Sequence, residues 1–261
     1  MKLYHNGEWK NESESVFTAL DRVRLGDGVF DTMLAMDGRL IHPVKHFTRL
    51  KENASVLGLS FDLDFETTAR KLIEGQAGRV AINTIITRGD SERGLAIPEN
   101  SKPSIVMRAA LAPENFPPIS AIIAQSVRRN EGSPLSRIKS LNYGDAILAL
   151  REASAKGANE AILLNNAGFV TCASSSNIFA VVNGEIFTPP LLDGVLNGVA
   201  RQVFIETFGA RELSLKPEDL LAAESVILTN SIRGAQAVEE LDGKTLPGTL
   251  PSGIDKDFVL Y

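Results

Sequence analysis

Three shortages in this chain of 261 residues each exclude a class of protein: it has one cysteine, three histidines and no surplus of positive charge. The single cysteine, Cys172, cannot form an internal disulfide, so a disulfide-stabilised secreted domain is excluded. The formal net charge of −5 leaves no basic surplus for a phosphate backbone, and we expect no nucleic-acid partner. The histidines all lie in the first fifth of the chain, and no Ser-His-Asp or Cys-His catalytic pattern is legible.

Long apolar runs are also missing. No stretch approaches the length of a membrane span, so we expect no membrane partner. Residues 1–8 turn polar at once, which argues against a secretory signal and makes the reducing cytoplasm the expected location. Gly26-Asp27-Gly28 does not extend to the third glycine of a dinucleotide-binding fingerprint. What is present, 44% hydrophobic and 23% charged residues, is typical of a globular protein with a substantial core.

Periodicity and turn residues divide the chain into interleaved helices and strands. Asp37-Gly38 and Asn183-Gly184 predict hairpins, and Pro43 predicts the first turn of a helix that runs to Gly58. Further helices are predicted at 64–74, 143–155, 197–209 and after Pro217, and strands at 80–87, 104–110, 119–127, 161–164, 178–182 and 225–229. This interleaving, with its hairpins, favours an α+β fold over a doubly wound sheet.

A proline-rich stretch is the best linker candidate. Leu111–Pro118 holds three prolines in eight residues, which is typical of a connection between domains. We therefore expect a small N-terminal domain of residues 1–112, a linker at 113–118 and a larger C-terminal domain of residues 119–261.

The segment Ser136–Tyr143 places a lysine, Lys139, between an apolar and a small polar residue, just before an Asn-Tyr pair. An amine that enters a partly buried position loses hydration, which favours the neutral form that attacks carbonyl groups. A lysine chosen at random is nevertheless a solvated surface residue in most cases. The hydroxyl-rich segment Gly168–Phe179 that follows makes a reactive lysine the better interpretation.

Six blocks, in their order along the chain, resemble the fold-type IV pyridoxal-phosphate enzymes: branched-chain aminotransferases, D-amino-acid transaminases and 4-amino-4-deoxychorismate lyases. The blocks are Leu25–Met33, His46–Leu50, Ser136–Tyr143, Thr171–Phe179, Gly194–Arg201 and Leu228–Gly234, and together they extend over nearly the whole chain. The resemblance implies a two-domain α+β fold of the D-amino-acid transaminase type, with pyridoxal 5′-phosphate in the cleft between the domains. It also implies a homodimer in which the neighbour closes each site.

The resemblance assigns roles to residues that hold the cofactor. Lys139 matches the lysine that forms a Schiff base with pyridoxal phosphate and then moves protons at the substrate α-carbon. Arg49 matches the phosphate-binding arginine, and a guanidinium offers a planar fork of donors to phosphate oxygens. The backbone amides of Val199 and Ala200, at the start of a helix, match groups that bind the same phosphate. Without the resemblance, Arg49 would be taken for an exposed helical arginine.

Three further residues match cofactor contacts of the family. Ser231, with Asn230 beside it, matches a hydroxyl contact to the phosphate, although Asn-Ser after a strand by itself predicts only a turn. Tyr143 matches a tyrosine that some relatives aim at the ring hydroxyl of the cofactor. A plain aromatic residue at a helix start remains an open alternative for Tyr143.

Cys172 departs from the family pattern. Relatives usually have a glutamate there, which keeps a proton on the pyridine nitrogen and strengthens the ring as an electron sink. A thiol is a poor partner for a pyridinium. This departure weakens transamination more than lyase chemistry, because loss of pyruvate from aminodeoxychorismate creates an aromatic ring. A small buried hydrophobic residue is the alternative interpretation of Cys172.

Three residues are candidates for contact with a small amino substrate that bears a carboxylate. Arg93 matches an arginine that binds substrate carboxylate in D-amino-acid transaminases, but its tyrosine and histidine companions fall on Phe30 and Leu95. Arg233 resembles a pattern common in aminodeoxychorismate lyases. Thr32 matches a threonine near the lyase active site, where a hydroxyl could relay a proton.

We therefore expect, as the leading hypothesis, a lyase that converts 4-amino-4-deoxychorismate to 4-aminobenzoate and pyruvate for folate synthesis. The first alternative is a class IV aminotransferase acting on branched-chain or D-amino acids, and the second is a pyridoxal-phosphate-binding protein of low turnover. His42 and His46 have a spacing that could bind a metal. No third ligand candidate lies nearby, so we expect no metal and favour a structural role for both.

Overall fold

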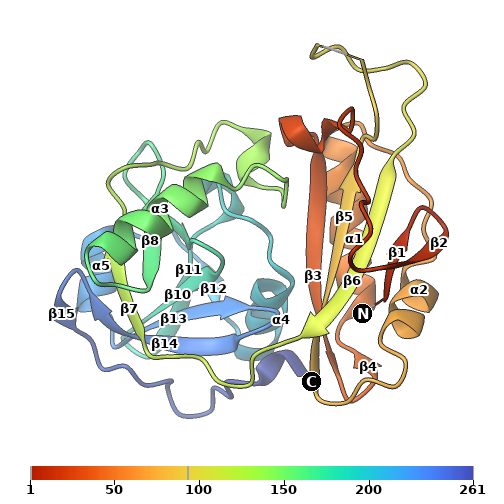
Figure 1. Cartoon of the computed structure of the whole chain (residues 1–261). Helices are drawn as coiled ribbons and strands as arrows, with labels where there is room; N and C mark the ends of the chain where they lie inside the picture. Colours follow the sequence, from red (N-terminus) through yellow and green to blue (C-terminus); the bar gives the residue numbers. More distant parts are fainter. Residues whose placement is uncertain (1, 93, 261) are drawn as a thin grey trace. The chain divides into compact units, whose positions relative to one another are not determined.

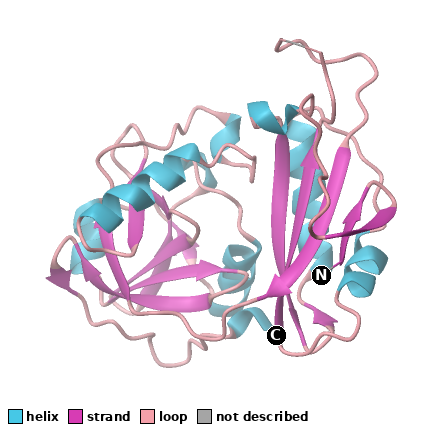
Figure 2. Ribbon diagram, viewed as in Figure 1, coloured by secondary structure: helices cyan, strands magenta, loops and turns pink. Residues whose placement is uncertain are grey.

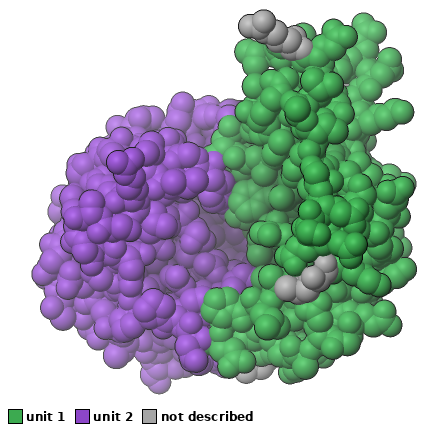
Figure 3. Space-filling view, in the orientation of Figure 1, with its two compact units in different colours: residues 1–114, 138–142 green, residues 115–137, 143–261 purple. Residues whose placement is uncertain are grey.

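The computed structural model describes residues 2–92 and 94–260, which form two compact units (Figure 3). Unit 1 comprises residues 1–114 with Ile138–Asn142, and unit 2 comprises residues 115–137 and 143–261. Their first boundary lies between residues 114 and 115, within the stretch 113–118 that we expected to be a linker. The strip Ile138–Asn142 belongs to unit 1 because it pairs with a strand there: Val29 and Ser140 form a β-bridge, and Leu141 N–H donates to Gly28 O at 3.0 Å.

Unit 1 is an antiparallel sheet with two helices (Figure 1). Its strands, in the order β2-β1-β6-β5-β3-β4, are β2 (Glu8–Asn11), β1 (Lys2–His5), β6 (Ser104–Leu111), β5 (Arg79–Thr87), β3 (Gly28–Met36) and β4 (Arg39–Leu40). The helices are α1 (Pro43–Val56) and α2 (Phe65–Leu72), and a 3₁₀ turn, η1, spans Arg22–Leu25. The core lies between sheet and helices, where Met33, Ile82 and Leu50 are almost fully buried.

Local sequence explains the elements of unit 1. Asp37 and Gly38 have φ of 48° and 77°, the left-handed pair that a tight hairpin turn needs, and so the hairpin expected there is confirmed. Pro43 stands in the first turn of α1, where a missing N–H costs nothing. The helix ends at Val56, and Gly58 just beyond it adopts the left-handed conformation, with φ of 63°. Asp64 caps α2 by accepting from Thr67 N–H at 3.2 Å.

Unit 2 is built on a nine-stranded mixed sheet with three helices. Eight strands follow the order β12-β11-β10-β13-β14-β7-β8-β9, and β15 pairs with β14. Their bounds are β7 (Ile119–Ile123), β8 (Glu160–Leu164), β9 (Val170–Ala173), β10 (Asn177–Val182), β11 (Glu185–Thr188), β12 (Arg211–Glu212), β13 (Ser225–Asn230), β14 (Gly234–Leu241) and β15 (Lys244–Thr245). The helices are α3 (Gly144–Ala155), α4 (Val199–Phe208) and α5 (Pro217–Ala222), with 3₁₀ turns η2 (Pro134–Ser136), η3 (Leu191–Asp193) and η4 (Phe258–Leu260).

Apolar packing fixes the helices of unit 2 against its strands. Phe204 of α4 lies 4.2 Å from Phe179 and 5.1 Å from Phe258, measured between ring centroids, and all three are fully buried or nearly so. Ala149 and Ala153 of α3 are fully buried in a second cluster with residues of β7 and β8. These contacts hold both helices against the sheet.

The expected α+β class is confirmed, since helices and strands alternate and the sheet of unit 1 is antiparallel (Figure 2). The strand expected at 119–127 was too long, because β7 ends at Ile123. The N–H groups of Gln125 and Ser126 donate to the carboxylate of Glu152 instead of a strand partner. Among the helices at residues 2–92 and 94–260, none combines the length and apolar character that a bilayer crossing requires.

Candidate active site

Lys139 lies at the edge of the unit 1 sheet, against Phe30. Phe30 N–H donates to Lys139 O at 2.9 Å, and the Lys139 Nζ lies 4.0 Å from the centroid of the Phe30 ring. Successive side chains of a strand point to opposite faces, so half-buried Phe30 and Thr32 share one face of β3 while buried Asp31 shares the other with α1. Lys139 is half-buried, as expected of a reactive amine that must still reach a ligand.

Asp31 holds two residues of α1 by hydrogen bonds. Its Oδ2 accepts from Arg49 Nε at 3.0 Å and from Nη2 at 2.5 Å, while its Oδ1 lies 2.5 Å from His46 Nδ1. All three side chains are buried. The Arg49 Nη1 group takes no part in this ion pair, so the guanidinium is fixed in direction and retains donors for an anion.

Burial and the neighbouring charges set the protonation states of Asp31 and His46. Burial alone would raise the pKa of Asp31, but Arg49 and His46 outweigh it and hold that pKa well below the ordinary range. Burial lowers the pKa of His46, and Asp31 opposes this shift only in part. The charges of Arg49 and Lys139 lower it further. A neutral His46 beside an ionised Asp31 therefore describes the site at neutral pH.

Asn83 of β5 is a residue that we did not anticipate. It is the cross-strand partner of Thr32, and its Nδ2 donates to Thr32 Oγ1 and to Asp31 O, each at 3.2 Å. Only the strand register reveals this contact, because 51 positions separate the two side chains.

The start of α4 in unit 2 has backbone amides that no side chain caps. Gly198 is its N-cap and no side chain caps the helix, which leaves the amides of Val199 and Ala200 available to an anion. A Cβ at position 198 would lie 2.1 Å from Asn177 Oδ1, so any larger residue would displace the Asn177 side chain. Asn177 in turn donates to Leu196 O at 2.9 Å and fixes the approach to the helix.

Asn230 organises the turn that carries Ser231 and Arg233. Its Oδ1 accepts from Ile232 N–H at 3.0 Å and from Arg233 N–H at 2.7 Å, and its Nδ2 donates to Ser176 Oγ at 3.1 Å. The Asn230 side chain is thus engaged within the protein, and half-buried Ser231 is the hydroxyl that remains for a ligand.

Arg233 has donors without acceptors. Its guanidinium carbon lies 5.3 Å from the Phe116 ring centroid, and its buried Nε and Nη1 have no hydrogen-bond partner among the described residues. Burial lowers the pKa of Arg233, and the charge of Glu160 opposes that shift. Glu160, which we did not anticipate either, is buried and accepts from Ser174 N–H at 3.1 Å and from Ser174 Oγ at 2.5 Å.

The remaining candidates occupy different positions. Cys172 is buried in β9 opposite Leu163, and the Thr171 hydroxyl nearest its sulfur, at 3.6 Å, also donates to Leu163 O. Tyr143 is half-buried at the N-cap of α3. Arg93 lies outside the described residues.

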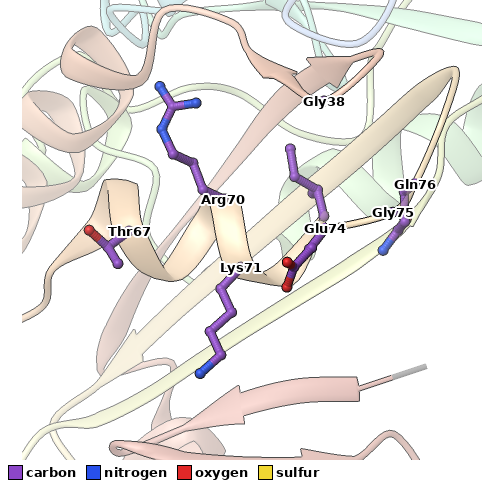
Figure 4. A pocket seen from close by; sticks show the side chains of 8 residues that line it. Gly38, Thr67, Arg70, Lys71, Glu74, Gly75 and Gln76 are labelled. Carbon is purple, nitrogen blue, oxygen red and sulfur yellow. The ribbon is translucent and has the colours of Figure 1, made fainter.

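A surface depression of about 440 Å³ in unit 1 contains none of the candidate residues (Figure 4). It is lined mainly by the C-terminal part of α2 and the turn after it, including Arg70, Lys71 and Glu74. Arg70 is already paired with Glu66 at 2.7 Å, and the lining carries charges of both signs. The depression therefore gives no support for a site among the residues that line it.

These groups match the chemistry of pyridoxal phosphate, which has a carbonyl that condenses with an amine and a phosphate that needs fixed donors. Lys139 is the amine in unit 1, and Arg49 is an anchored guanidinium in the same unit. In unit 2, two segments contact the start of β10. The start of α4 does so where Gly198 lies against Asn177, and the turn that carries Ser231 does so where Asn230 donates to Ser176. The residues present fit the cofactor.

Comparison with known proteins places this arrangement in a family. The model of the amino-transferase class IV family matches residues 28–241, and the chain belongs to that family. A protein of Methanocaldococcus jannaschii, provisionally named a branched-chain-amino-acid aminotransferase, is 32% identical over 94% of this chain and 90% of its own. D-alanine aminotransferase of Staphylococcus epidermidis is 27% identical, with coverage of 100% and 97%.

Solved structures agree with this assignment. A crystal structure from Legionella pneumophila, provisionally named a 4-amino-4-deoxychorismate lyase, superposes with a TM-score of 0.84 at 29% identity, covering 92% of each chain. The expected family, fold type and cofactor, pyridoxal 5′-phosphate, are confirmed.

Proposed function

We propose that this protein is a lyase that uses pyridoxal phosphate to convert 4-amino-4-deoxychorismate to 4-aminobenzoate and pyruvate. The observation that carries the proposal is Arg233, whose buried Nε and Nη1 donors have no acceptor in the part of the chain that the structure describes. Buried donors almost always have an acceptor, so the two unpaired donors of Arg233 favour an anionic ligand. Aminodeoxychorismate bears two carboxylates, whereas a branched-chain amino acid bears one.

The residues of the chain divide the work of holding the cofactor. Lys139 is the attachment amine, and Arg49 binds phosphate in a direction set by Asp31. The amides of Val199 and Ala200 and the hydroxyl of Ser231 supply further donors to phosphate, while Tyr143 contributes a ring contact and Asn230 shapes the Ser231 turn. When bound, the cofactor supplies a carbonyl for condensation and a ring that withdraws electrons from the substrate amine carbon.

The proposed reaction balances without a second substrate. Lys139, as the neutral amine, removes the proton from the ring carbon that bears the amino group. The electron pair of that C–H bond forms a double bond to the neighbouring ring carbon, whose bond to the enolpyruvyl oxygen breaks, and the electron pair of the C–O bond leaves with the oxygen. The proton returns to the departing enolpyruvyl group, which becomes pyruvate, and the ring becomes aromatic. Thr32, on the same face of β3 as the Phe30 ring that Lys139 covers, is the candidate relay for this proton.

Cys172 is compatible with this chemistry. No carboxylate among the described residues forms a hydrogen bond with its sulfur, so β9 provides no acid partner for a pyridine nitrogen at this position. Formation of an aromatic product supplies driving force that an unprotonated ring would not. Transamination has no such compensation.

An aminotransferase acting on branched-chain or D-amino acids is the second candidate. It is favoured by the 32% identity to the Methanocaldococcus protein and the 27% identity to D-alanine aminotransferase. A third candidate, a cofactor-binding protein of low turnover, is motivated by Cys172 alone.

Product analysis separates the candidates. Purified protein loaded with pyridoxal phosphate is given aminodeoxychorismate without any 2-oxo acid, and both pyruvate and 4-aminobenzoate are measured. Equal amounts of the two products support the lyase, with Lys139→Ala as the inactive control. Activity that depends strictly on a 2-oxo acid acceptor identifies an aminotransferase, and a spectral shift without product identifies the binding protein.

A further inference from the structure

The amide of Asn83 has an orientation that its surroundings determine. Asp31 O is a backbone carbonyl and can only accept, so the group that faces it at 3.2 Å must be the Asn83 Nδ2. The same Nδ2 faces Thr32 Oγ1, also at 3.2 Å. An amide nitrogen only donates, and Thr32 Oγ1 is therefore the acceptor in this contact.

This arrangement sets the direction of the Thr32 proton. A hydroxyl whose oxygen accepts from Asn83 keeps its own hydrogen for another partner. The Asn83 Oδ1 forms no hydrogen bond with residues 2–92 or 94–260, and both side chains are half-buried. The Thr32 hydroxyl, as donor, and the Asn83 side-chain carbonyl, as acceptor, thus belong to residues that are cross-strand partners in β3 and β5.

Thr32 lies close to the reactive amine within the same unit. Residues two apart in a strand are about 6.6 Å apart and share a face, which places Thr32 next to Phe30. The Lys139 Nζ lies 4.0 Å from the centre of the Phe30 ring. The oriented hydroxyl and the amine that moves protons in the proposed reaction therefore both adjoin Phe30.

We propose that Asn83 is a positioning residue that orients the Thr32 hydroxyl as a proton donor beside Lys139. The inference rests on the proposed function in one respect, since it assigns Thr32 to the path of the proton. It applies equally to lyase and aminotransferase chemistry, because both move a proton at the carbon that bears the substrate amine. The competing explanation is that the Asn83–Thr32 pair only stabilises the sheet, as polar cross-strand pairs do.

A double-mutant cycle distinguishes these explanations. The variants are Thr32→Val, Asn83→Leu and the two combined, each close in size to the original side chains. The first readout is the rate at which loaded enzyme exchanges the α-proton of amino acids with D₂O, over D-alanine, L-leucine and L-glutamate. We expect Thr32→Val to slow exchange about a hundredfold, within the range of general acid–base catalysis, and Asn83→Leu about tenfold. The combined variant should be no slower than Thr32→Val, because Asn83 acts through Thr32.

A further variant tests the direction of the hydrogen bond. In Asn83→Asp the carboxylate only accepts, so the Thr32 hydroxyl should donate its hydrogen bond to that carboxylate. Exchange should then be as slow as in Thr32→Val. Exchange at the original rate in Asn83→Asp, or slowing factors for Thr32 and Asn83 that multiply in the combined variant, would overturn the proposal.

The second readout needs no cofactor. The melting temperature of cofactor-free protein is measured for the same cycle, where the combined variant should lose less than the sum of the single losses. Losses that add fully show that no hydrogen bond couples the pair, which also overturns the proposal. If pyruvate release fails while the exchange cycle holds, the lyase assignment is wrong and the role of Asn83 stands.

Discussion

Asp31 and Arg49 are joined by two hydrogen bonds to one oxygen, from Nε at 3.0 Å and from Nη2 at 2.5 Å, inside the core of unit 1. A guanidinium held in this way cannot rotate away from its partner, so the free edge of Arg49 has a fixed direction. The pair lies on the α1 side of β3, and the backbone of Asp31 accepts the Asn83 amide that orients Thr32. One residue, Asp31, therefore contacts both Arg49, the proposed phosphate ligand, and Asn83 of the proposed proton path.

Asp31→Asn should destabilise the protein by about 3 kcal/mol, because it leaves the buried Arg49 charge without its counter-ion. Chemical denaturation gives the free energy of unfolding. Glu66→Gln breaks a pair of similar length, Glu66–Arg70, that is half exposed, and it should cost less than about 0.5 kcal/mol. Equal losses in the two variants would show that burial of the Asp31 pair adds nothing.

Arg49→Ala should weaken cofactor affinity by about 2–4 kcal/mol, since a charge-assisted contact is truncated and the phosphate is left short of donors. Titration of apoprotein with pyridoxal phosphate measures the dissociation constant. Arg49→Lys is the matched variant, because it keeps the charge but loses the pair of hydrogen bonds to Asp31. Its dissociation constant should lie between those of the original protein and Arg49→Ala. An unchanged constant in Arg49→Ala would remove Arg49 from the phosphate site.

Lys139→Ala should abolish covalent attachment of the cofactor while the fold persists, because a methyl group cannot condense with a carbonyl. Borohydride treatment followed by intact-protein mass measurement detects the attachment. Lys51→Ala is the control, since its Nζ also lies over a phenylalanine ring in unit 1, 4.9 Å from the Phe47 centroid. Retention of a reducible attachment in Lys139→Ala would show that another lysine binds the cofactor.

His46 should make the protein sensitive to mild acid. Its pKa in the folded state is lower than the unfolded value near 6.5, mainly through burial, so the unfolded chain binds the proton more readily. The stability that neutral His46 provides is therefore complete above about pH 6.5 and declines as the pH falls below it. Asp31 also has a lowered pKa, but its contribution is lost only below about pH 4.

The corresponding variant is His46→Gln, which cannot take up a proton in this range. Between about pH 6.5 and 5 its free energy of unfolding should fall less steeply than that of the original protein. Urea denaturation at several pH values supplies the comparison. Parallel pH profiles would mean that His46 stays neutral over the whole range or that other groups dominate.

Cys172→Glu would place a carboxylate at the position where the resemblance implies a glutamate. If it protonates the pyridine nitrogen, the amino-transfer half-reaction should accelerate about tenfold, which corresponds to about 1.4 kcal/mol. Pyruvate release should change less, because aromatisation already drives it. The melting temperature of loaded protein is the control, as an unpaired buried carboxylate costs stability. A stable, loaded variant with no faster amino transfer would indicate that the nitrogen already has a partner.

Much of the fold could be predicted from local patterns. The hairpin at Asp37-Gly38, the start of α1 at Pro43 and the short helix after Pro217 depend on residues adjacent in sequence, and all are present. Strand β14 was missed because Glu239 and Glu240 break its apolar pattern. The β7 strand was overextended because its end is set by Glu152, which lies on α3.

The site was predictable only where a motif carried the signal. Lys139 and Arg49 were proposed as site residues from such motifs, whereas Asn83 and Glu160 stand in strands that carry no catalytic motif. Their roles follow from strand register, which pairs Thr32 with Asn83, and from the turn that brings Ser174 onto Glu160. Register depends on contacts across the whole sheet, and no local pattern specifies it.

The strip Ile138–Asn142 has a consequence for how the protein can be made and divided. The polypeptide leaves unit 1 after residue 114, returns for five residues that complete its sheet edge, and leaves again. During synthesis the edge beside Gly28 and Phe30 must wait for a segment encoded beyond residue 137. A gene fragment ending at residue 114 would lack Lys139, and one beginning at residue 115 would carry Lys139 without Phe30. Neither fragment alone could bring the lysine to its ring, so the contact between Lys139 and Phe30 needs both segments of the chain.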